Sequence, residues 1–263
     1  MAITNIISVL MVASVVAASN IHPVMGILTA IFMWPVHLWV YVRTHNFYHQ
    51  PKPSLAYELS GTIATAFSGY SWNIYKATHR NHHQHNNGPR DATVTFKNGE
   101  VIGGAQYLWK NSIKPWFFQQ LPFSYWFVLP YFRKSKAIIV DEVLKLVVKF
   151  IAFYFAGWAG VLGVLVLNLM NFIQLGYGNY LQHFDRPEGH AHDWNHTLLN
   201  RIYVNFGMHE CHHKHPRRLW NELEHIDGKE GCTISFYAIF SPFSFVRFLI
   251  SPESLRKTFS GLS

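Results

Sequence analysis

The sequence predicts an all-α integral membrane protein with about four transmembrane helices in two hairpins. Three observations predict this class. Apolar residues make up 49% of the 263 residues, whereas charged residues make up only 14%. Long apolar runs occur in two pairs, and a polar or glycine-containing break separates the members of each pair. Each run is near the length of about 20 residues that a helix needs to cross a bilayer core.

The first hairpin is expected close to the N-terminus. Its apolar segments cover residues 3–18 and 24–42, with a polar break at residues 19–23. The first segment lacks a basic leader and a small-residue cleavage site, so we expect it to be retained rather than removed as a signal peptide. Pro35 is expected to kink the second segment, because proline interrupts helical hydrogen bonding.

The second hairpin is expected at residues 137–156 and 158–178, with the break at the glycine between them. Its first helix carries Asp141, Lys145 and Lys149. These side chains are four residues apart and therefore share one face of the helix. We expect them to pair with one another or to extend their charged ends to the edge of the membrane.

Basic residues indicate how both hairpins are oriented. Five of them flank the open ends of the hairpins: Arg43, Lys52, Arg133, Lys134 and Lys136. The short turns contain no lysine or arginine, and cytoplasmic loops are the ones enriched in these residues. We therefore expect both hairpins to open toward the cytoplasm, within a single domain of residues 1–263 whose cytoplasmic regions are residues 43–136 and 179–263.

Charge and cysteine content exclude several classes of protein. The formal net charge is +8, but lysine and arginine gather beside apolar segments rather than forming a basic face interleaved with aromatic residues. A membrane surface is therefore expected as partner, and no nucleic acid. Cys211 and Cys232 are the two cysteines, so neither a disulfide framework nor an iron cluster held by sulfur is expected within this chain.

Histidine is the unusual residue of this sequence. The chain has seventeen histidines, and most of them fall into tight groups. The groups are His45 and His49 as HxxxH, His79, His82 and His83 as HxxHH, the isolated His183, and His209, His212 and His213 as a second HxxHH. Because residues three and four apart share a helix face, each spacing is expected to aim two or three imidazoles at one point. Such grouping indicates a metal site at the cytoplasmic membrane face.

The ordered set of histidine groups resembles the histidine-box signature of membrane fatty acid desaturases and of the related alkane and acyl hydroxylases. The stretch Asn179-Tyr-Leu-Gln-His183-Phe-Asp, the following Trp194, and Asp91 after the second box are similar to the same superfamily. The resemblance covers residues 43–225. It implies a cytoplasmic helical cap over the membrane helices, in which two irons activate dioxygen to attack the hydrocarbon chain of a lipid. The implied metal ligands are His45, His49, His79, His82, His83, His183, His209, His212 and His213.

The resemblance leaves two reactions open, because desaturation and hydroxylation begin with the same removal of hydrogen. We favour a fatty acyl desaturase, since the second and third boxes both read HxxHH and the Leu-Gln-His183 stretch is closer to that branch. A fatty acyl or alkane hydroxylase with the same di-iron site is the alternative.

Two other classes of protein match parts of the sequence. His209, Glu210 and His213 also fit HExxH, the motif of zinc metalloproteases, which would indicate an intramembrane protease. That reading leaves the first two boxes and His183 unexplained. A metal transporter would need polar ligands within the bilayer, whereas the boxes lie at or beyond the ends of the predicted spans.

An oxidase of this kind needs electrons from outside the chain. Neither a four-cysteine cluster nor a glycine-rich dinucleotide motif is present in the sequence, so we expect a separate carrier such as a ferredoxin, a rubredoxin or a small haem cytochrome. The basic residues expected to dock it are Arg217, Arg218, Arg256 and Lys257. Further histidines near the boxes are expected to orient ligands or to be solvated: His85, His215, His190, His192 and His196.

Overall fold

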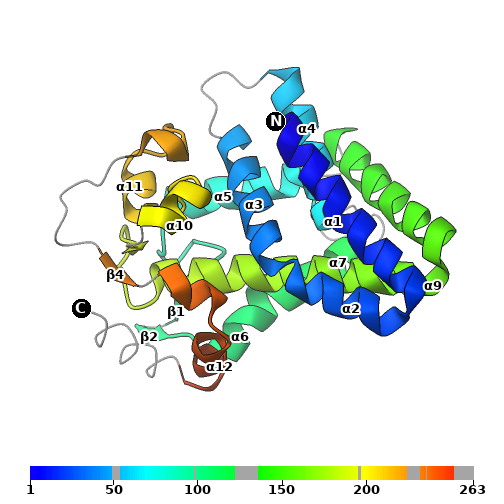
Figure 1. The fold of residues 1–263 in the computed structure, drawn as a ribbon. Helices are drawn as coiled ribbons and strands as arrows, with labels where there is room; N and C mark the ends of the chain where they lie inside the picture. Colours follow the sequence, from blue (N-terminus) through cyan, green and yellow to red (C-terminus); the bar gives the residue numbers. More distant parts are fainter. Residues whose placement is uncertain are drawn as a thin grey trace. The chain divides into compact units, whose positions relative to one another are not determined.

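The computed structural model describes residues 1–48, 54–97, 99–121, 136–194, 197–223, 232–234 and 236–251. The chain divides into two compact units. Unit 1 comprises residues 1–48, 52–77 and 113–173, and unit 2 comprises residues 49–51, 78–112 and 174–263. The described residues are mostly helical, as predicted, and Figure 1 shows their elements in chain order. The prediction of a single domain stays a prediction.

Unit 1 is built from helices. They are α1 (Ala2–Ile21), α2 (Pro23–Phe32), α3 (Trp34–Tyr48), α4 (Leu55–Ser68), the start of α5 (Trp72–His85), α7 (Lys114–Gln120) and the greater part of α9 (Lys136–His183). Of the described helices, α1 and α9 are long and apolar enough to cross a membrane, and α2 with α3 is a further candidate if the pair forms one span. The number of four spans stays a prediction.

The segment predicted as one helix at residues 24–42 is two helices. The break lies at Met33, and α2 and α3 are bent there by 53°. Pro35 is the second residue of α3, where its missing N–H costs nothing but its ring prevents a helix from continuing through it. The predicted kink is confirmed, and it is sharp enough to end one helix and begin another.

The predicted break in the second hairpin is confirmed within α9. A straight helix of 48 residues would extend about 70 Å, which is more than twice the thickness of a bilayer core of about 30 Å. Ala156 and Gly157 leave the helical conformation, with φ of −139° and 58°. The conformation of Gly157, with ψ of −150°, is one that glycine adopts far more readily than other residues. Figure 1 shows α9 changing direction between its two arms.

Small residues let the apolar helices of unit 1 approach closely. A Cβ atom added to Gly26 or Gly163 would lie within 3 Å of Ser19 Oγ, so Ser19 packs against two glycines of neighbouring segments. Close approach through small residues is typical of helices packed within membranes. The apolar core beside this contact comprises Met11, Val12, Val15, Val16, Ala30, Val148, Ala152, Val164 and Leu167.

The charged residues Asp141, Lys145 and Lys149 of α9 bond to other groups of unit 1. Asp141 and Lys145 are 1% and 2% exposed. Lys145 forms an ion pair with Glu142, with Nζ and Oε1 2.6 Å apart, and donates to the carbonyl of Gln119 in the last turn of α7. Lys149 donates to the carbonyl of Gln120 at 3.0 Å. Two ammonium groups thus satisfy carbonyls at a helix C-terminus, where positive charge is favourable.

Asp141 has the complementary position at the start of α5. Its Oδ2 accepts hydrogen bonds from the hydroxyl of Ser71, which precedes the helix, and from the backbone and side-chain nitrogens of Asn73. A buried carboxylate therefore caps the N-terminus of α5, the helix that later carries the second histidine box.

Replacing Asp141 should destabilise the protein because it leaves buried donors of Ser71 and Asn73 without an acceptor. We expect Asp141→Ala to cost about 1–3 kcal/mol, seen as a loss of roughly 3–10 °C in the melting temperature of the detergent-purified protein. Val140→Ala is the matched control, since Val140 is the neighbouring residue and is 48% exposed. Equal melting temperatures for the two variants would contradict a capping role.

Unit 2 contains shorter elements connected by loops. They are the end of α5, β1 (Phe96–Lys97), β2 (Glu100–Val101), α6 (Gly104–Leu108), most of the π-helical turn η1 (Trp109–Ile113), the end of α9, β3 (Asp193–Trp194), α10 (Thr197–Ile202), α11 (His209–Lys214), the short turns η3 (Trp220–Glu222) and η4 (Phe236–Phe240), β4 (Cys232–Ile234) and α12 (Pro242–Ile250). β1 pairs with β2 antiparallel, and β3 pairs with β4 in parallel. These strands were not predicted, because strands of two or three residues leave no periodic pattern.

Candidate metal centre

Three helical segments of unit 2 carry seven of the nine predicted ligands. The end of α5 carries His79, His82 and His83, α9 ends on His183, and α11 carries His209, His212 and His213. Five of the seven are buried, and His183 and His212 are completely so. Polar rings buried in such number need partners to offset their lost hydration.

The first group of converging rings joins α5 to α11. Nε2 of His83 lies 2.9 Å from Nε2 of His79 and 2.9 Å from Nε2 of His212. The candidate ligand atoms of these three residues all lie within 4.8 Å of one another. Two residues of the second box and one residue of the third box therefore aim at one point.

The second group joins all three segments. Nε2 of His209 lies 3.0 Å from Nε2 of His183 and 3.1 Å from Nε2 of His213. His82 completes this group, whose ligand atoms again lie within 4.8 Å of one another. The two groups are adjacent, since the ring centroids of His83 and His213 are 4.4 Å apart.

Each HxxHH box aims two imidazoles at one point, within the expected two or three, and its remaining imidazole belongs to the other group. The box divides in this way because adjacent residues of a helix point about 100° apart. The pair at i and i+4 faces one group, and the residue at i+3 faces the other. His79 and His83 thus join His212, while His209 and His213 join His82.

The donor set fits metal ions better than hydrogen bonds. One Nε2 carries either a proton or a lone pair, so Nε2 of His83 cannot make two well-directed hydrogen bonds to two further Nε2 atoms. Transition metals bind imidazole nitrogen at about 2.1 Å, and two nitrogens held at right angles around one ion are then about 3 Å apart. The buried Nε2 of His82 has no hydrogen-bond partner among the described residues. Both groups therefore have the nitrogen spacing of a metal site.

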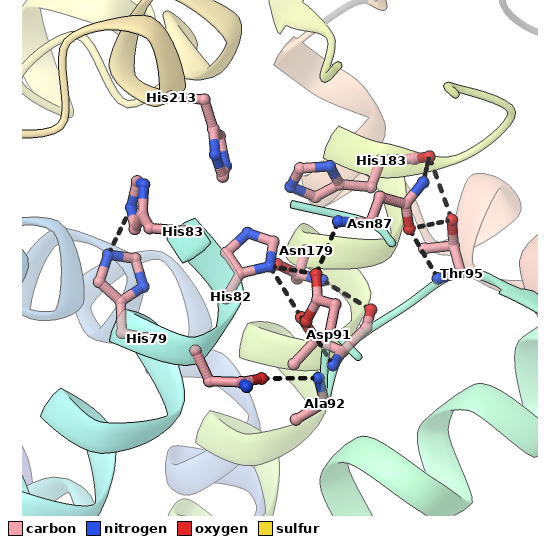
Figure 2. Close-up of polar contacts among 12 residues, drawn as sticks. His79, His82, His83, Asn87, Asp91, Ala92, Thr95, Asn179, His183 and His213 are labelled. Atoms are coloured by element: carbon pink, nitrogen blue, oxygen red, sulfur yellow. Dashed lines mark hydrogen bonds and ion pairs between the residues drawn. The ribbon is translucent and has the colours of Figure 1, made fainter. Parts of the chain in front are cut away.

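A buried carboxylate fixes the orientation of His82, as Figure 2 shows. Oδ2 of Asp91 lies 2.7 Å from Nδ1 of His82 and also accepts from the backbone N–H of Asn87, and Oδ1 accepts from Thr93. Because an ionised carboxylate only accepts, Nδ1 of His82 carries the proton, and the lone pair remains on Nε2. Burial opposes ionisation, but the contact with His82 and the backbone N–H groups outweigh it and hold the pKa of Asp91 well below its usual value.

His183 is held in the same way by backbone groups. Its Nδ1 donates to the carbonyl of His190 at 3.2 Å, which again leaves the lone pair on Nε2. Its own carbonyl accepts from Asn87 Nδ2 and Thr95 Oγ1. Burial lowers the pKa of His183 and of His213 well below the usual histidine value. Both rings are therefore neutral, which is the form that binds metals.

A comparison with protein-family models finds one match that covers most of the chain. The model described as fatty acid desaturase matches residues 19–231. The chain belongs to the fatty acid desaturase family. It is accordingly an oxidoreductase of a family that uses iron and acts on lipid chains at membranes. A search of curated proteins finds no match.

Family membership and geometry both argue against the protease alternative. In HExxH proteases the glutamate acts as general base beside the metal. Here the carboxylate of Glu210 accepts from the backbone N–H of Ala191, contacts Nδ1 of His190 and forms an ion pair with Lys214. Burial alone would raise the pKa of Glu210, but these contacts outweigh it and lower that pKa. Glu210 thus supports the loop that orients His183.

The structure describes only some of the other predicted site residues. His45 is buried in α3 of unit 1, with its ring 6.0 Å from that of Tyr41. His49 and His196 lie outside the described residues, so the roles of His45 and His49 stay predictions. His85 and His215 belong to neither group of the described part of the chain.

Several residues that support the site of this desaturase-family protein were missed in the sequence. Asn87 and Thr95 hold the end of α9, and the ring of Trp220 stacks on His212 with centroids 4.4 Å apart. His192, which was expected to orient ligands or to be solvated, is buried: it donates from Nε2 to the carbonyl of Phe184, and burial lowers its pKa to about 4. None of these contacts leaves a local pattern, because each joins residues that are distant in sequence or uses the backbone.

Asp91 should control metal affinity without being a ligand. We expect Asp91→Asn to weaken iron binding by about 10–100-fold, because the amide no longer fixes the proton on Nδ1 of His82. The measurement is iron retained by the purified protein during titration with a competing chelator. Asp185→Asn is the control, since Asp185 is exposed and has a positive φ of 58° that asparagine tolerates. Equal retention by both variants would contradict the assignment.

Proposed function

We propose that this protein is a membrane-bound di-iron fatty acyl desaturase, which uses dioxygen to introduce a double bond into the hydrocarbon chain of a lipid. The observation that carries the proposal is the pair of imidazole groups in unit 2, each with nitrogens converging at the spacing of metal ligands. Family membership supplies the substrate class and the use of iron.

The proposed ligand set divides into the two groups and the first box. His79, His83 and His212 would hold one iron, and His82, His183, His209 and His213 the other. His45 and His49 complete the set of nine. When bound, the irons supply an oxidant strong enough to remove hydrogen from an unactivated methylene group.

The chain's own residues prepare the site for this chemistry. Asp91 and the carbonyl of His190 keep protons on the Nδ1 atoms of His82 and His183, so that Nε2 of each ring is ready to bind. The aromatic face of Trp220 covers His209 and His212. Burial of these rings limits the access of water, which would otherwise hydrate the ring nitrogens and compete with them for the metal.

The reaction requires electrons that this chain does not carry. Removing two hydrogens from a lipid chain while reducing dioxygen to two waters takes two electrons and two protons from outside. We propose an external carrier of the ferredoxin, rubredoxin or small haem cytochrome class, on the cytoplasmic face that the flanking basic residues indicate. Arg217 and Arg218 are exposed in unit 2, and Arg256 and Lys257 lie outside the described residues.

Reversing charge on this surface should slow delivery of electrons. At low salt, we expect Arg217→Glu with Arg218→Glu to reduce carrier-dependent turnover about 10-fold, because opposite charge steers the encounter with an acidic carrier. Turnover driven by a small chemical reductant is the control and should not change. Unchanged carrier-dependent rates would exclude these arginines from docking.

The products distinguish the proposed reaction from hydroxylation. Purified protein reconstituted with a lipid, dioxygen and reductant should yield a product that has lost two hydrogens. A product that has gained one oxygen would instead assign the protein to the hydroxylases. We expect His82→Ala to abolish either product and His215→Ala, outside both groups, to retain it. A product formed equally without dioxygen would contradict both assignments.

A further inference from the structure

Helix α12 has two unlike faces. Phe243, Val246 and Ile250 are 80%, 50% and 78% exposed, and their spacing of three and four residues places them on one side of the helix. Arg247 is exposed on the same side. Ser244 and Phe248, on the other side, are 5% and 0% exposed. Three large apolar side chains on a nine-residue helix therefore have no cover within the described residues.

The buried side of α12 packs on the end of α9. The ring centroid of Tyr177 lies 5.1 Å from that of Phe245 and 5.0 Å from that of Phe248, and the ring of Tyr180 lies 4.7 Å from Phe248. A Cβ atom added to Gly104 would clash with the carbonyl oxygen of Phe248. Only glycine lets α6 approach this closely, so α12 is held firmly in place within unit 2.

The position of these contacts along α9 is informative. Tyr177 and Tyr180 lie where the long apolar run of α9, predicted to span residues 158–178, gives way to Asn179 and His183. Each tyrosine donates its hydroxyl to a backbone carbonyl of unit 2, Tyr177 to Ala238 and Tyr180 to Ile102. Both tyrosines are completely buried, so these bonds fix α9 to unit 2 at the end of its apolar run. α12 therefore packs at the level where α9 is expected to leave the bilayer.

We propose that α12 lies in the plane of the cytoplasmic membrane interface, with Phe243, Val246 and Ile250 inserted at the boundary of the phospholipid acyl chains. Helices of this kind bury their apolar face about 5–10 Å into that boundary. The long side chain of Arg247 reaches the phosphates of the head groups. The inference rests on the membrane topology within the proposed function, and it does not depend on the reaction.

The inserted helix α12, which anchors unit 2 to the membrane, would also set the position of the metal centre. His183 lies three residues beyond Tyr180, which is about 4.5 Å along a helix. Because α12 contacts Tyr180 directly, its insertion fixes the height of His183 above the lipid surface. For any lipid chain that reaches the site, the distance from the lipid surface to His183 is thereby fixed.

Spin labelling measures the depth of α12 without using catalysis. A nitroxide is attached at Val246→Cys in the full-length protein in phosphatidylcholine and phosphatidylglycerol vesicles, and its collisions with oxygen and with a water-soluble nickel chelate are compared. Asn221→Cys, at an exposed polar position of η3, is the matched control. The unsubstituted protein, which contains Cys211 and Cys232, gives the background.

At residue 246 we expect the ratio of oxygen to nickel collisions to exceed that at residue 221 at least 5-fold. Equal ratios would place α12 in water and overturn the proposal. Dipolar broadening between labels at residue 246 would also overturn it, because a second copy of the chain would then cover this face. If the collision ratios at residues 246 and 221 are equal while the protein still turns over, the membrane insertion of α12 is rejected and the proposed function is not. If the ratio at residue 246 is high in a protein without turnover, the insertion of α12 remains supported.

Discussion

The direction of side chains on a helix is the constraint on which the metal centre depends. Histidines at positions i, i+3 and i+4 cannot all meet at one point, because neighbouring residues point about 100° apart. Each HxxHH box therefore contributes to two groups, and neither group closes with one helix alone. α5 and α11 must face each other, with the end of α9 beside them, before the nitrogens reach 2.9–3.1 Å. The packing of α5, α9 and α11 is thus determined by the requirement that both groups of histidines come together at the same time.

The helix that carries the second box is held by carboxylates at both ends. Asp141 caps the N-terminus of α5 within unit 1, and Asp91 holds His82 near its C-terminus within unit 2. Both carboxylates are buried and both accept several hydrogen bonds, which offsets the cost of removing their charge from water. Asp141, Lys145 and Lys149 of α9 thus bond to groups at the ends of α5 and α7. Their burial is consistent with the apolar surroundings, since each charge meets a donor or acceptor there.

Local features of the fold and the site were predictable, whereas contacts between distant residues were not. The breaks before Pro23 and at Gly157 follow from single residues with restricted or unusual backbone conformations. The seven histidines of the two groups follow from spacing on a helix. The hydrogen bonds of Asn87 and Thr95 to the carbonyl of His183 join residues 96 and 88 positions apart. No periodic pattern in the sequence encodes such pairs of distant residues. The burial of Asp141 could not be predicted from the sequence either.

The metal content of the purified protein tests the central claim most directly. The account predicts about two irons per chain and no zinc. Both irons should be lost in His82→Ala and in His212→Ala, because the two groups are adjacent and are both built on α5 and α11, so the loss of one group disturbs the other. His215→Ala should retain both. A single zinc that survives His82→Ala and His212→Ala but is lost in His213→Ala would contradict the di-iron centre and restore the metalloprotease alternative, whose HExxH ligands are His209 and His213.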